Sequence, residues 1–266
     1  MNGAPVVIKL GGRALEAPAA AAELALELAG LAGRAVLVHG GGGEVTAWCE
    51  RLGIAARFEG GRRVTDAATL EVAAAVLAGL VNKRLVAQLR ARGVDAVGLA
   101  ALDGGLATIT PHADRAAFGE VGVVNAIDGR LVTDLLARGR TPVIASIGQC
   151  EGRLLNVNAD DLAAALAPAL GSAALVLLSD APGLVLGGEV TPALDLAALD
   201  RALQSPEVQG GMAPKLEAAR AAVAGGTNVA WIGSWAGPGT LARALAGNEG
   251  GTRIARALTD KEAVRG

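Results

Sequence analysis

Short, continuously apolar runs alternate along the chain with longer Ala/Leu-rich segments of helical periodicity. Continuous apolar runs are typical of strands that are covered on both faces of a parallel sheet. The pattern predicts strands at residues 6–10, 35–38, 96–99, 142–146, 175–178 and 229–232, another near 252–255, and a hairpin formed by 106–110 and 119–125. Helices are predicted at residues 14–31, 44–52, 66–89, 128–137, 158–169 (beginning at Asn158 or Asp160), 196–203, 212–224 and 240–246.

Strands separated by helices predict an α/β fold in which a mainly parallel sheet is covered on both faces. Because crossovers are right-handed, the carboxyl ends of the strands, with their glycine turns, would lie along one edge of the sheet. The turn-rich stretch 146–156 is the best candidate for a boundary. We therefore expect an N-terminal lobe at residues 1–150 and a C-terminal lobe at 151–266.

Composition argues against several classes of protein. The 266 residues are 52% hydrophobic but 2% aromatic, and the net charge is −2. Nucleic-acid modules need stacking rings or a basic field, so no nucleic-acid partner is expected. Cys49 and Cys150 form no CxxC pair, and His39 and His112 lack metal-ligand spacing. We expect two reduced thiols and no metal held by protein side chains.

The chain shows no targeting or membrane signal. Residues 1–10 lack a basic region and carry Lys9 inside their apolar run. Residues 162–179 are uncharged, but Pro168 and Gly171 interrupt them, and they divide into a helix, a turn and a strand. We therefore expect a cytoplasmic protein with no membrane partner.

Lysine is rare in this chain. Of 24 basic residues four are lysine, namely Lys9, Lys83, Lys215 and Lys261. Because arginine serves almost everywhere else, the lysines are candidates for places that need a compact ammonium group. The alternative is that their distribution is chance.

Glycine pairs and runs follow several predicted strands, at Gly11–Gly12, Gly40–Gly43, Gly60–Gly61 and Gly210–Gly211. Such turns let backbone amides approach an anion closely, although they also serve as tight turns without a ligand. The sequence contains no GxxxxGK[ST], no GxGxxG after Gly40 and no GxSxG. This argues against P-loop proteins, dinucleotide dehydrogenases and serine hydrolases.

Three charged side chains fit the transfer of a phosphoryl group to a carboxylate. Lys9 ends the first strand and Lys215 begins a late helix, and two ammonium groups would offset the repulsion between the two anions. Asp160 could hold both lysines, or it could simply cap its helix. Arg63 has a planar guanidinium group that can bind a carboxylate through two hydrogen bonds, or it is a solvated surface residue.

The order and spacing of these segments resemble the N-acetylglutamate kinases of the amino acid kinase family. The similar segments span nearly the whole chain, and they are Ile8–Gly12, Val38–Gly42, Gly61–Thr65, Gly79–Lys83, Asn156–Asp160, Leu178–Gly183, Gly210–Lys215 and Gly251–Ile254. Each segment alone is weak evidence for the family, but in this order and spacing the segments together are specific evidence for it. The resemblance implies a three-layer α/β/α sandwich around an open, mainly parallel sheet, with the amino-acid substrate bound by the N-terminal lobe and MgATP by the C-terminal lobe.

The resemblance also implies the roles of individual residues. Lys9 and Lys215 would stabilise the transferring phosphoryl group, and Asp160 would orient them. The residues expected to bind the acylated amino acid are Gly41, Gly42, Arg63 and Asn156. Those expected along the nucleotide are Gly11, Gly12, Ser179, Asp180, Gly183 and Gly210. Mg²⁺ would be carried by ATP, and the product would be an acyl phosphate formed by direct transfer.

Three departures from the family pattern concern the substrate. Arg62 stands where an apolar residue is usual, Gly43 where many members have proline, and the loop 99–104 lacks a common lysine. Arginine-inhibited members of the family usually carry an extra N-terminal helix that joins dimers into hexamers, whereas this chain starts directly at the first strand. The resemblance therefore implies a homodimer without arginine feedback. Two alternatives stay open: a kinase for aminoadipate or glutamate attached to an acidic carrier protein, and a non-catalytic regulator that binds an amino acid.

Overall fold

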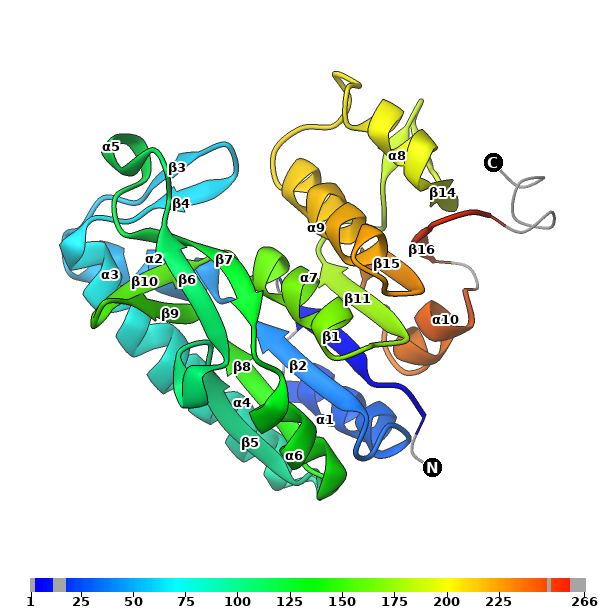
Figure 1. Ribbon diagram of the computed structural model, residues 1–266, viewed down its shortest axis with the longest axis horizontal. Helices are drawn as coiled ribbons and strands as arrows, with labels where there is room; N and C mark the ends of the chain where they lie inside the picture. Colours follow the sequence, from blue (N-terminus) through cyan, green and yellow to red (C-terminus); the bar gives the residue numbers. More distant parts are fainter. Residues whose placement is uncertain (1–2, 12–17, 248–249, 259–266) are drawn as a thin grey trace.

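The computed structural model describes residues 3–11, 18–247 and 250–258, and its centre is a large, twisted sheet (Figure 1). In spatial order its strands are β14 (Ala193–Asp195), β16 (Gly251–Ala255), β15 (Val229–Ser234), β11 (Ala174–Ser179), β1 (Val6–Leu10), β2 (Ala35–His39), β8 (Thr141–Ala145) and β5 (Ala96–Ala100). Among these strands every neighbouring pair is parallel except β15–β16. The predicted α/β fold with a mainly parallel sheet is confirmed.

Helices cover both faces of this sheet because successive strand residues point to opposite sides. Val7 of β1 packs with α7 and α9, whereas Ile8 packs with α1, α4 and α10. The helices are α1 (Pro18–Ala29), α2 (Gly42–Arg51), α3 (Ala67–Ala74), α4 (Asn82–Arg90), α5 (Arg115–Phe118), α6 (Arg130–Ala137), α7 (Ala159–Ala169), α8 (Leu196–Ala202), α9 (Met212–Ala224) and α10 (Thr240–Ala246), with a 3₁₀ turn at Asp103–Gly105. The three layers expected from the resemblance are therefore present.

A smaller sheet lies over the end of β8 and contains the strands β6 (Ala107–Pro111), β7 (Val121–Ile127), β10 (Arg153–Val157) and β9 (Ile147–Cys150). The predicted hairpin is confirmed as the antiparallel pair β6–β7. The interpretation of residues 146–156 as a loop and turn cluster is wrong, because they form the hairpin β9–β10. Its turn residues Glu151 and Gly152 both have positive φ, as a two-residue hairpin turn requires.

Two short hairpins complete the fold, β3 (Arg57–Glu59) with β4 (Arg62–Val64), and β12 (Val185–Leu186) with β13 (Glu189–Val190). The Gly60–Gly61 pair, read from the sequence as a glycine turn that approaches an anion, forms the tip of the first hairpin, with φ of 53° and 76°. The long helix predicted at 66–89 is present but contains a π-helical segment, η2 (Ala75–Val81), between α3 and α4.

The two halves of the sequence occupy opposite halves of the sheet. Strands β2, β8 and β5 lie on one side of β1, and β11, β15, β16 and β14 lie on the other. The assignment of a separate binding role to each half remains a prediction.

Candidate active site

The carboxyl ends of the central strands are level with one another. Leu10, which ends β1, is paired with His39 of β2 and with Leu178 of β11, and His39 is paired with Ala145 of β8. The chain also changes direction across the sheet at β1, because β2 and β11 lie on opposite sides of it. In open α/β sheets such a switch point is where ligands bind.

Lys9 points toward α7 and α9 because it shares the face of β1 with Val7. Its side chain is 9% exposed, and its Nζ lies 2.8 Å from Oδ1 of Asp160. Gly11 makes this position possible, since a Cβ on Gly11 would lie 2.5 Å from the Lys9 Nζ and 2.8 Å from the Leu178 carbonyl oxygen. The nearby glycine therefore makes room for the ammonium group itself.

Asp160 stands in the first turn of α7, but it does not cap that helix. The N-cap is Asn158, whose side-chain oxygen accepts hydrogen bonds from the backbone N–H groups of Asp160 and Asp161. Of the two alternatives left by the sequence, the capping role therefore belongs to Asn158. The carboxylate of Asp160 is left to pair with lysines.

Lys215 reaches the other oxygen of the same carboxylate. It lies in the first turn of α9, and its Nζ is 3.5 Å from Oδ2 of Asp160 and 3.2 Å from the carbonyl oxygen of Gly211. A cation near a helix N-terminus is disfavoured by the helix dipole, and the negative charge of Asp160 offsets this. Two ammonium groups separated by most of the chain thus meet on one buried aspartate.

The charge of Asp160 follows from these neighbours. Burial by itself would raise the pKa of the Asp160 carboxyl, but Lys9 and Lys215 together outweigh burial and hold that pKa below its usual value. The neighbouring Asp161 behaves differently: burial raises its pKa, and the ion pair with Arg62 offsets this only in part. The site therefore contains a carboxylate that stays ionised between two cations.

A cavity of about 210 Å³ opens beside these groups. Its wall includes Lys9 and Asp160, the glycine turn after β2 and five further polar side chains, which are Arg62, Arg63, Ser146, Asn156 and Asn158. Lys9, Arg63 and Asn156, predicted from separate motifs, are therefore brought to one cavity. Its lining combines cations, amides and backbone N–H groups, which suits a small anionic ligand.

Arg63 is held rigidly in the wall of this cavity. Its Nη2 donates to the carbonyl oxygen of Gly42 and to Oγ1 of Thr46, and its guanidinium lies over the Phe58 ring at 4.7 Å. Its Nη1 is buried and has no hydrogen-bond partner among the described residues. Burial also lowers the pKa of the Arg63 guanidinium. A buried cationic donor without a partner is suited to a carboxylate ligand, whereas a solvated surface arginine, the alternative, is excluded by its 9% exposure.

The glycine turn shows which of its residues must be glycine. Gly41 has a φ of 150°, and a Cβ there would lie 2.9 Å from Leu77 Cδ2. A Cβ on Gly42 would meet nothing within 4 Å, so the space beside this residue is open to a ligand. Gly42 and Gly43 begin α2, where backbone N–H groups have no acceptor within the helix. Asn156, across the cavity, donates from Nδ2 to Thr65 Oγ1.

The β3–β4 hairpin closes one side of the cavity. Its tip touches the loop before α9, since a Cβ on Gly61 would lie 3.3 Å from the carbonyl oxygen of Gly210. Beside the tip, Arg62 Nη1 lies 2.6 Å from Asp161 Oδ2 of α7. Sequence reasoning missed this ion pair and the contact of Thr46 with Arg63, because both join segments that no local pattern connects.

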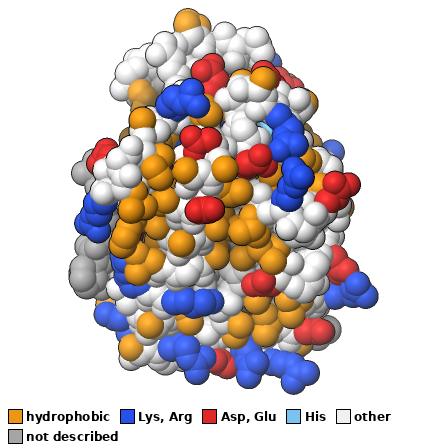
Figure 2. Space-filling model, turned by 90° about the vertical axis from the view of Figure 1, so that its left-hand side faces the viewer, with side chains coloured by type: hydrophobic (Ala, Val, Ile, Leu, Met, Phe, Trp, Pro, Cys, Tyr) orange, Lys and Arg blue, Asp and Glu red, His pale blue; other side chains and the backbone are white. Residues whose placement is uncertain are grey.

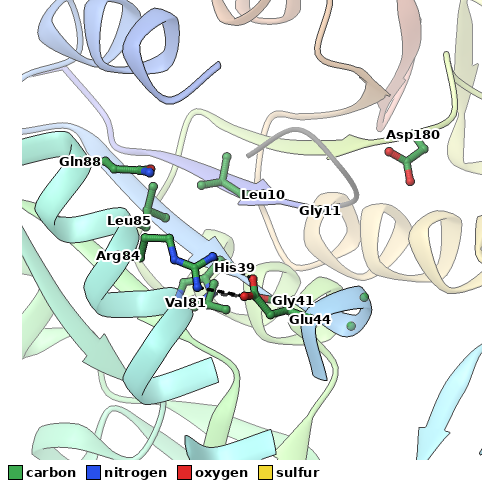
Figure 3. Close-up of a pocket in the computed structure, with 13 residues that line it drawn as sticks. Leu10, Gly11, His39, Gly41, Glu44, Val81, Arg84, Leu85, Gln88 and Asp180 are labelled. Atoms are coloured by element: carbon green, nitrogen blue, oxygen red, sulfur yellow. Dashed lines mark hydrogen bonds and ion pairs between the residues drawn. The ribbon is translucent and has the colours of Figure 1, made fainter. Parts of the chain in front are cut away.

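A second, larger cavity of about 420 Å³ adjoins the first on the other side of the glycine turn (Figure 3). Gly11 and Gly40–Gly42 line both cavities. Figure 3 shows Arg84 of α4 reaching the carboxylate of Glu44 on α2, with Asp180 on the far side. The two cavities together span the distance from Arg63 to the end of β11.

Of the remaining predicted nucleotide residues, Ser179, Asp180 and Gly183 lie at or just after the end of β11. Ser179 is buried and its Oγ accepts from the Ala181 N–H, while Asp180 lines the larger cavity. Gly183 has a φ of 151°, and a Cβ there would meet Thr252 Oγ1 at 2.8 Å. Gly210 has a φ of 58° and stands in the loop before α9. Gly12 lies outside the described residues.

Neither a metal cluster nor a membrane span is found in the described part of the chain. No group of three or more His, Cys, Asp or Glu residues there could hold a metal ion. No helix among the described residues has the length and apolar character to cross a bilayer.

Comparison with known proteins places this site in a family. The family model described as "Amino acid kinase family" matches residues 4–234. The chain belongs to the amino acid kinase family. Within it, the acetylglutamate kinase of Rubrobacter xylanophilus is 43% identical over 249 residues, which cover 94% of this chain and 96% of that protein.

Solved structures agree with the family. The N-acetylglutamate synthase of Neisseria gonorrhoeae, solved with coenzyme A and N-acetyl-glutamate, matches with a TM-score of 0.83 and 25% identity over 97% of this chain and 61% of its own. The carbamate kinase of Giardia has a TM-score of 0.67 and 18% identity over 97% of this chain and 100% of its own, and it shows the fold alone. The family model and the acetylglutamate kinase relatives show that this amino acid kinase is a phosphotransferase, as the sequence predicted.

Proposed function

We propose that this amino acid kinase transfers the γ-phosphoryl group of MgATP to the γ-carboxylate of N-acetyl-L-glutamate, giving N-acetylglutamyl 5-phosphate for arginine biosynthesis. The observation that carries the proposal is the meeting of Lys9 and Lys215 on Asp160, at 2.8 Å and 3.5 Å, beside a cavity with a carboxylate-binding arginine. Relatives called acetylglutamate kinase cover nearly the full chain at about 40% identity, for example 40% over 251 residues.

The lysines address the main barrier to this reaction, which is the approach of two anions. A carboxylate oxygen attacks the γ-phosphorus while the bond from that phosphorus to the bridging oxygen breaks, and ADP leaves with the bridging oxygen. Negative charge on the transferring group is stabilised by the ammonium groups of Lys9 and Lys215, which Asp160 holds in place before substrate arrives. No protein nucleophile is required.

The smaller cavity is assigned to the acylated amino acid. Arg63 Nη1, buried without a partner among the described residues, would bind the α-carboxylate, with Asn156 beside it. The N–H groups of Gly41 and Gly42 would meet the reacting carboxylate. Gly11, Ser179, Asp180, Gly183 and Gly210 would line the path of the nucleotide, and Mg²⁺ would arrive bound to ATP.

The two lobes and the assembly belong to the same proposal. Residues 1–150 would bind the amino acid and 151–266 the nucleotide. We further propose a cytoplasmic location, as expected from the sequence, and a homodimer, because the face in Figure 2 carries hydrophobic side chains between charged ones. Leu52 is 60% exposed, and Leu80 and Leu154 are 38% and 39% exposed. Sedimentation equilibrium measures the mass directly, and a monomer would contradict this part.

The two other candidate functions are disfavoured by particular contacts. A kinase for a carrier-linked substrate would use Arg62 to meet an acidic carrier, but Arg62 is paired with Asp161. A non-catalytic binder has no need of two lysines on one aspartate. Incubation with MgATP and hydroxylamine separates the proposed function from the other two. Hydroxamate is expected from N-acetylglutamate and not from free glutamate or aminoadipate, and the absence of hydroxamate from N-acetylglutamate would refute the proposal.

A further inference from the structure

A chain of hydrogen bonds lies beneath the glycine turn. One member, His39, lines the larger cavity, and the function proposed above assigns no role to any of its side chains. His39, at the end of β2, is 1% exposed. Its Nδ1 lies 2.8 Å from the carbonyl oxygen of Gly40, and its Nε2 lies 3.0 Å from Nδ2 of Asn82. Asn82, fully buried at the start of α4, continues the chain through its Oδ1, which lies 3.0 Å from Nζ of Lys83.

The direction of each hydrogen bond follows from what each group can do. The ammonium of Lys83 can only donate, so the oxygen of the Asn82 amide must face it. The Asn82 nitrogen lies 2.9 Å from the Val143 carbonyl oxygen, which can only accept. The Leu99 carbonyl oxygen, 3.3 Å from the same nitrogen, is a second acceptor. The side-chain amide of Asn82 therefore has one orientation, with its nitrogen facing Val143, Leu99 and His39.

This orientation determines the tautomer of His39. The Nε2 atom faces a donor and must accept, so its proton is absent. The Nδ1 atom faces the Gly40 carbonyl oxygen and must donate. Burial lowers the pKa of His39, Lys83 lowers it further by its charge, and the Gly40 carbonyl opposes both. The ring is thus a neutral imidazole with its proton on Nδ1.

The Nδ1–H group in turn orients the peptide between Gly40 and Gly41. No cis peptide bond occurs among the described residues, so the Gly41 N–H points opposite to the Gly40 carbonyl and away from the ring. Gly41 is the N-cap of α2 and lines both cavities. Glycine is conformationally free, so without the histidine this peptide plane would rotate easily.

Gly98 of β5 has no side chain, and this leaves the space that the side chains of Asn82 and Lys83 occupy. A Cβ on Gly98 would clash with Asn82 Oδ1 and would lie 2.8 Å from Lys83 Nζ. Gly98 also accepts a long hydrogen bond of 3.5 Å from that ammonium through its carbonyl oxygen. The absence of a side chain here allows Asn82 and Lys83 to meet.

We infer that Lys83, Asn82 and His39 are positioning residues, which together aim the Gly41 N–H at the anionic oxygens of the reacting groups. The inference deepens the proposed function and rests on it for its kinetic consequence. Lys83, one of the chain's four lysines, then has a role outside the transfer itself. It helps to hold the side-chain amide of Asn82 in one orientation, and that orientation determines the tautomer of His39.

The tautomer is tested without any activity measurement. The chain contains two histidines, so long-range ¹H–¹⁵N correlation spectra at pH 7 show two rings, and a His112→Gln variant assigns them. The expected result is a neutral His39 ring with its proton on Nδ1. A proton on Nε2, or a cationic ring, would overturn the inference. If the wild-type protein makes no acyl phosphate, the proposed function fails while this result still decides the tautomer.

Two substitutions of His39 separate positioning from packing. His39→Asn keeps an N–H donor near the place of Nδ1, whereas His39→Gln keeps only the reach toward Asn82. Both lose the ring, so both are expected to lower the melting temperature. His39→Gln is expected to lower kcat about 10²-fold with KM nearly unchanged, and His39→Asn to retain most of kcat. Equal kcat values for the two variants would overturn the inference.

Lys83→Met tests the far end of the chain at an exposed position where folding is not at risk. Without the ammonium, only the carbonyl oxygens of Val143 and Leu99 still orient the Asn82 amide, so the His39 spectrum is expected to show a minor second tautomer and kcat to fall about threefold. Arg90→Met, which removes an exposed charge from the end of the same helix, is the matched control. An unchanged His39 spectrum in Lys83→Met would contradict the proposed dependence of the His39 tautomer on Lys83.

Discussion

Arg62 Nη1 lies 2.6 Å from Asp161 Oδ2 and thereby ties the β3–β4 hairpin to α7, next to Asp160. Both side chains are about a quarter exposed, at 22% and 27%. The pair stands at the mouth of the smaller cavity, whose wall includes Arg62. The hairpin is therefore held over the cavity by a contact that is separate from the groups proposed to react.

Loss of this ion pair is expected to affect binding more than transfer. Arg62→Met should raise KM for N-acetylglutamate about fivefold, because a partly exposed pair contributes about 1 kcal/mol. The value of kcat should change less than twofold, since Lys9, Asp160 and Lys215 keep their places. Steady-state kinetics checks this at low and high salt, with Arg57→Met on the preceding strand as the control. A large fall in kcat with unchanged KM would contradict the role of the hairpin.

Arg63 is expected to need its guanidinium and not merely its charge. Arg63→Lys keeps the charge but cannot contact Gly42, Thr46 and a ligand at the same time. KM for N-acetylglutamate should rise about 10- to 100-fold, which corresponds to the loss of charge-assisted hydrogen bonds of about 1.5–3 kcal/mol. KM for ATP should stay within about twofold. Equal increases in both KM values would show that Arg63 acts on the whole fold.

The two lysines are expected to act on kcat. Lys9→Met and Lys215→Met should each lower kcat about 10³-fold, because each removes a cation from the transferring phosphoryl group. Arg92→Met removes a cation from an exposed turn and should leave kcat unchanged. Circular dichroism confirms that the variants are folded. A folded Lys9→Met enzyme with wild-type kcat would remove the basis for the proposed mechanism.

Asp160 and Asp161 are expected to influence stability with opposite dependence on pH. The pKa of Asp160 is held below its usual value, so its ionisation stabilises the fold above the pKa of the unfolded chain, and this contribution is lost as pH falls through the folded-state pKa. The pKa of Asp161 is raised, so its ionisation costs stability as pH rises.

Urea unfolding of Asp160→Asn and Asp161→Asn tests this difference. Asp160→Asn should be less stable than wild type by about 3 kcal/mol at pH 7, and the deficit should shrink only as pH falls below about 4. Relative to wild type, Asp161→Asn should instead gain stability as pH rises above about 4. Slopes of the same sign for both variants would contradict the assignment of charge at these two positions.

The sequence was sufficient for the layers, and it singled out three charged residues whose side chains the structure brings together. Continuous apolar runs identify buried parallel strands, and the carboxyl ends of such strands must share an edge, which brings Lys9 to the glycine turn after β2. The grouping of Lys9, Asp160 and Lys215 was proposed from their chemistry and from a family resemblance. The structure shows that the three side chains meet.

Other features depend on contacts that local patterns do not encode. Residues 147–157 lack clear alternation, and their hairpin depends on a turn at Glu151 and Gly152 and on pairing with β7. The ion pair of Arg62 with Asp161 joins positions 99 residues apart. The hydrogen-bonded chain from Lys83 to His39 likewise requires α4 to pack against the end of β2, which periodicity alone does not specify.

The central claim is that two lysines on one aspartate promote transfer of phosphate to the carboxylate of N-acetylglutamate. ³¹P NMR of the protein with MgATP and N-acetylglutamate observes the product directly. The account predicts an acyl phosphate signal that appears together with ADP in wild type and is nearly absent in Lys9→Met and Lys215→Met. Inorganic phosphate as the sole product in wild type, or an undiminished acyl phosphate signal in both variants, would contradict it.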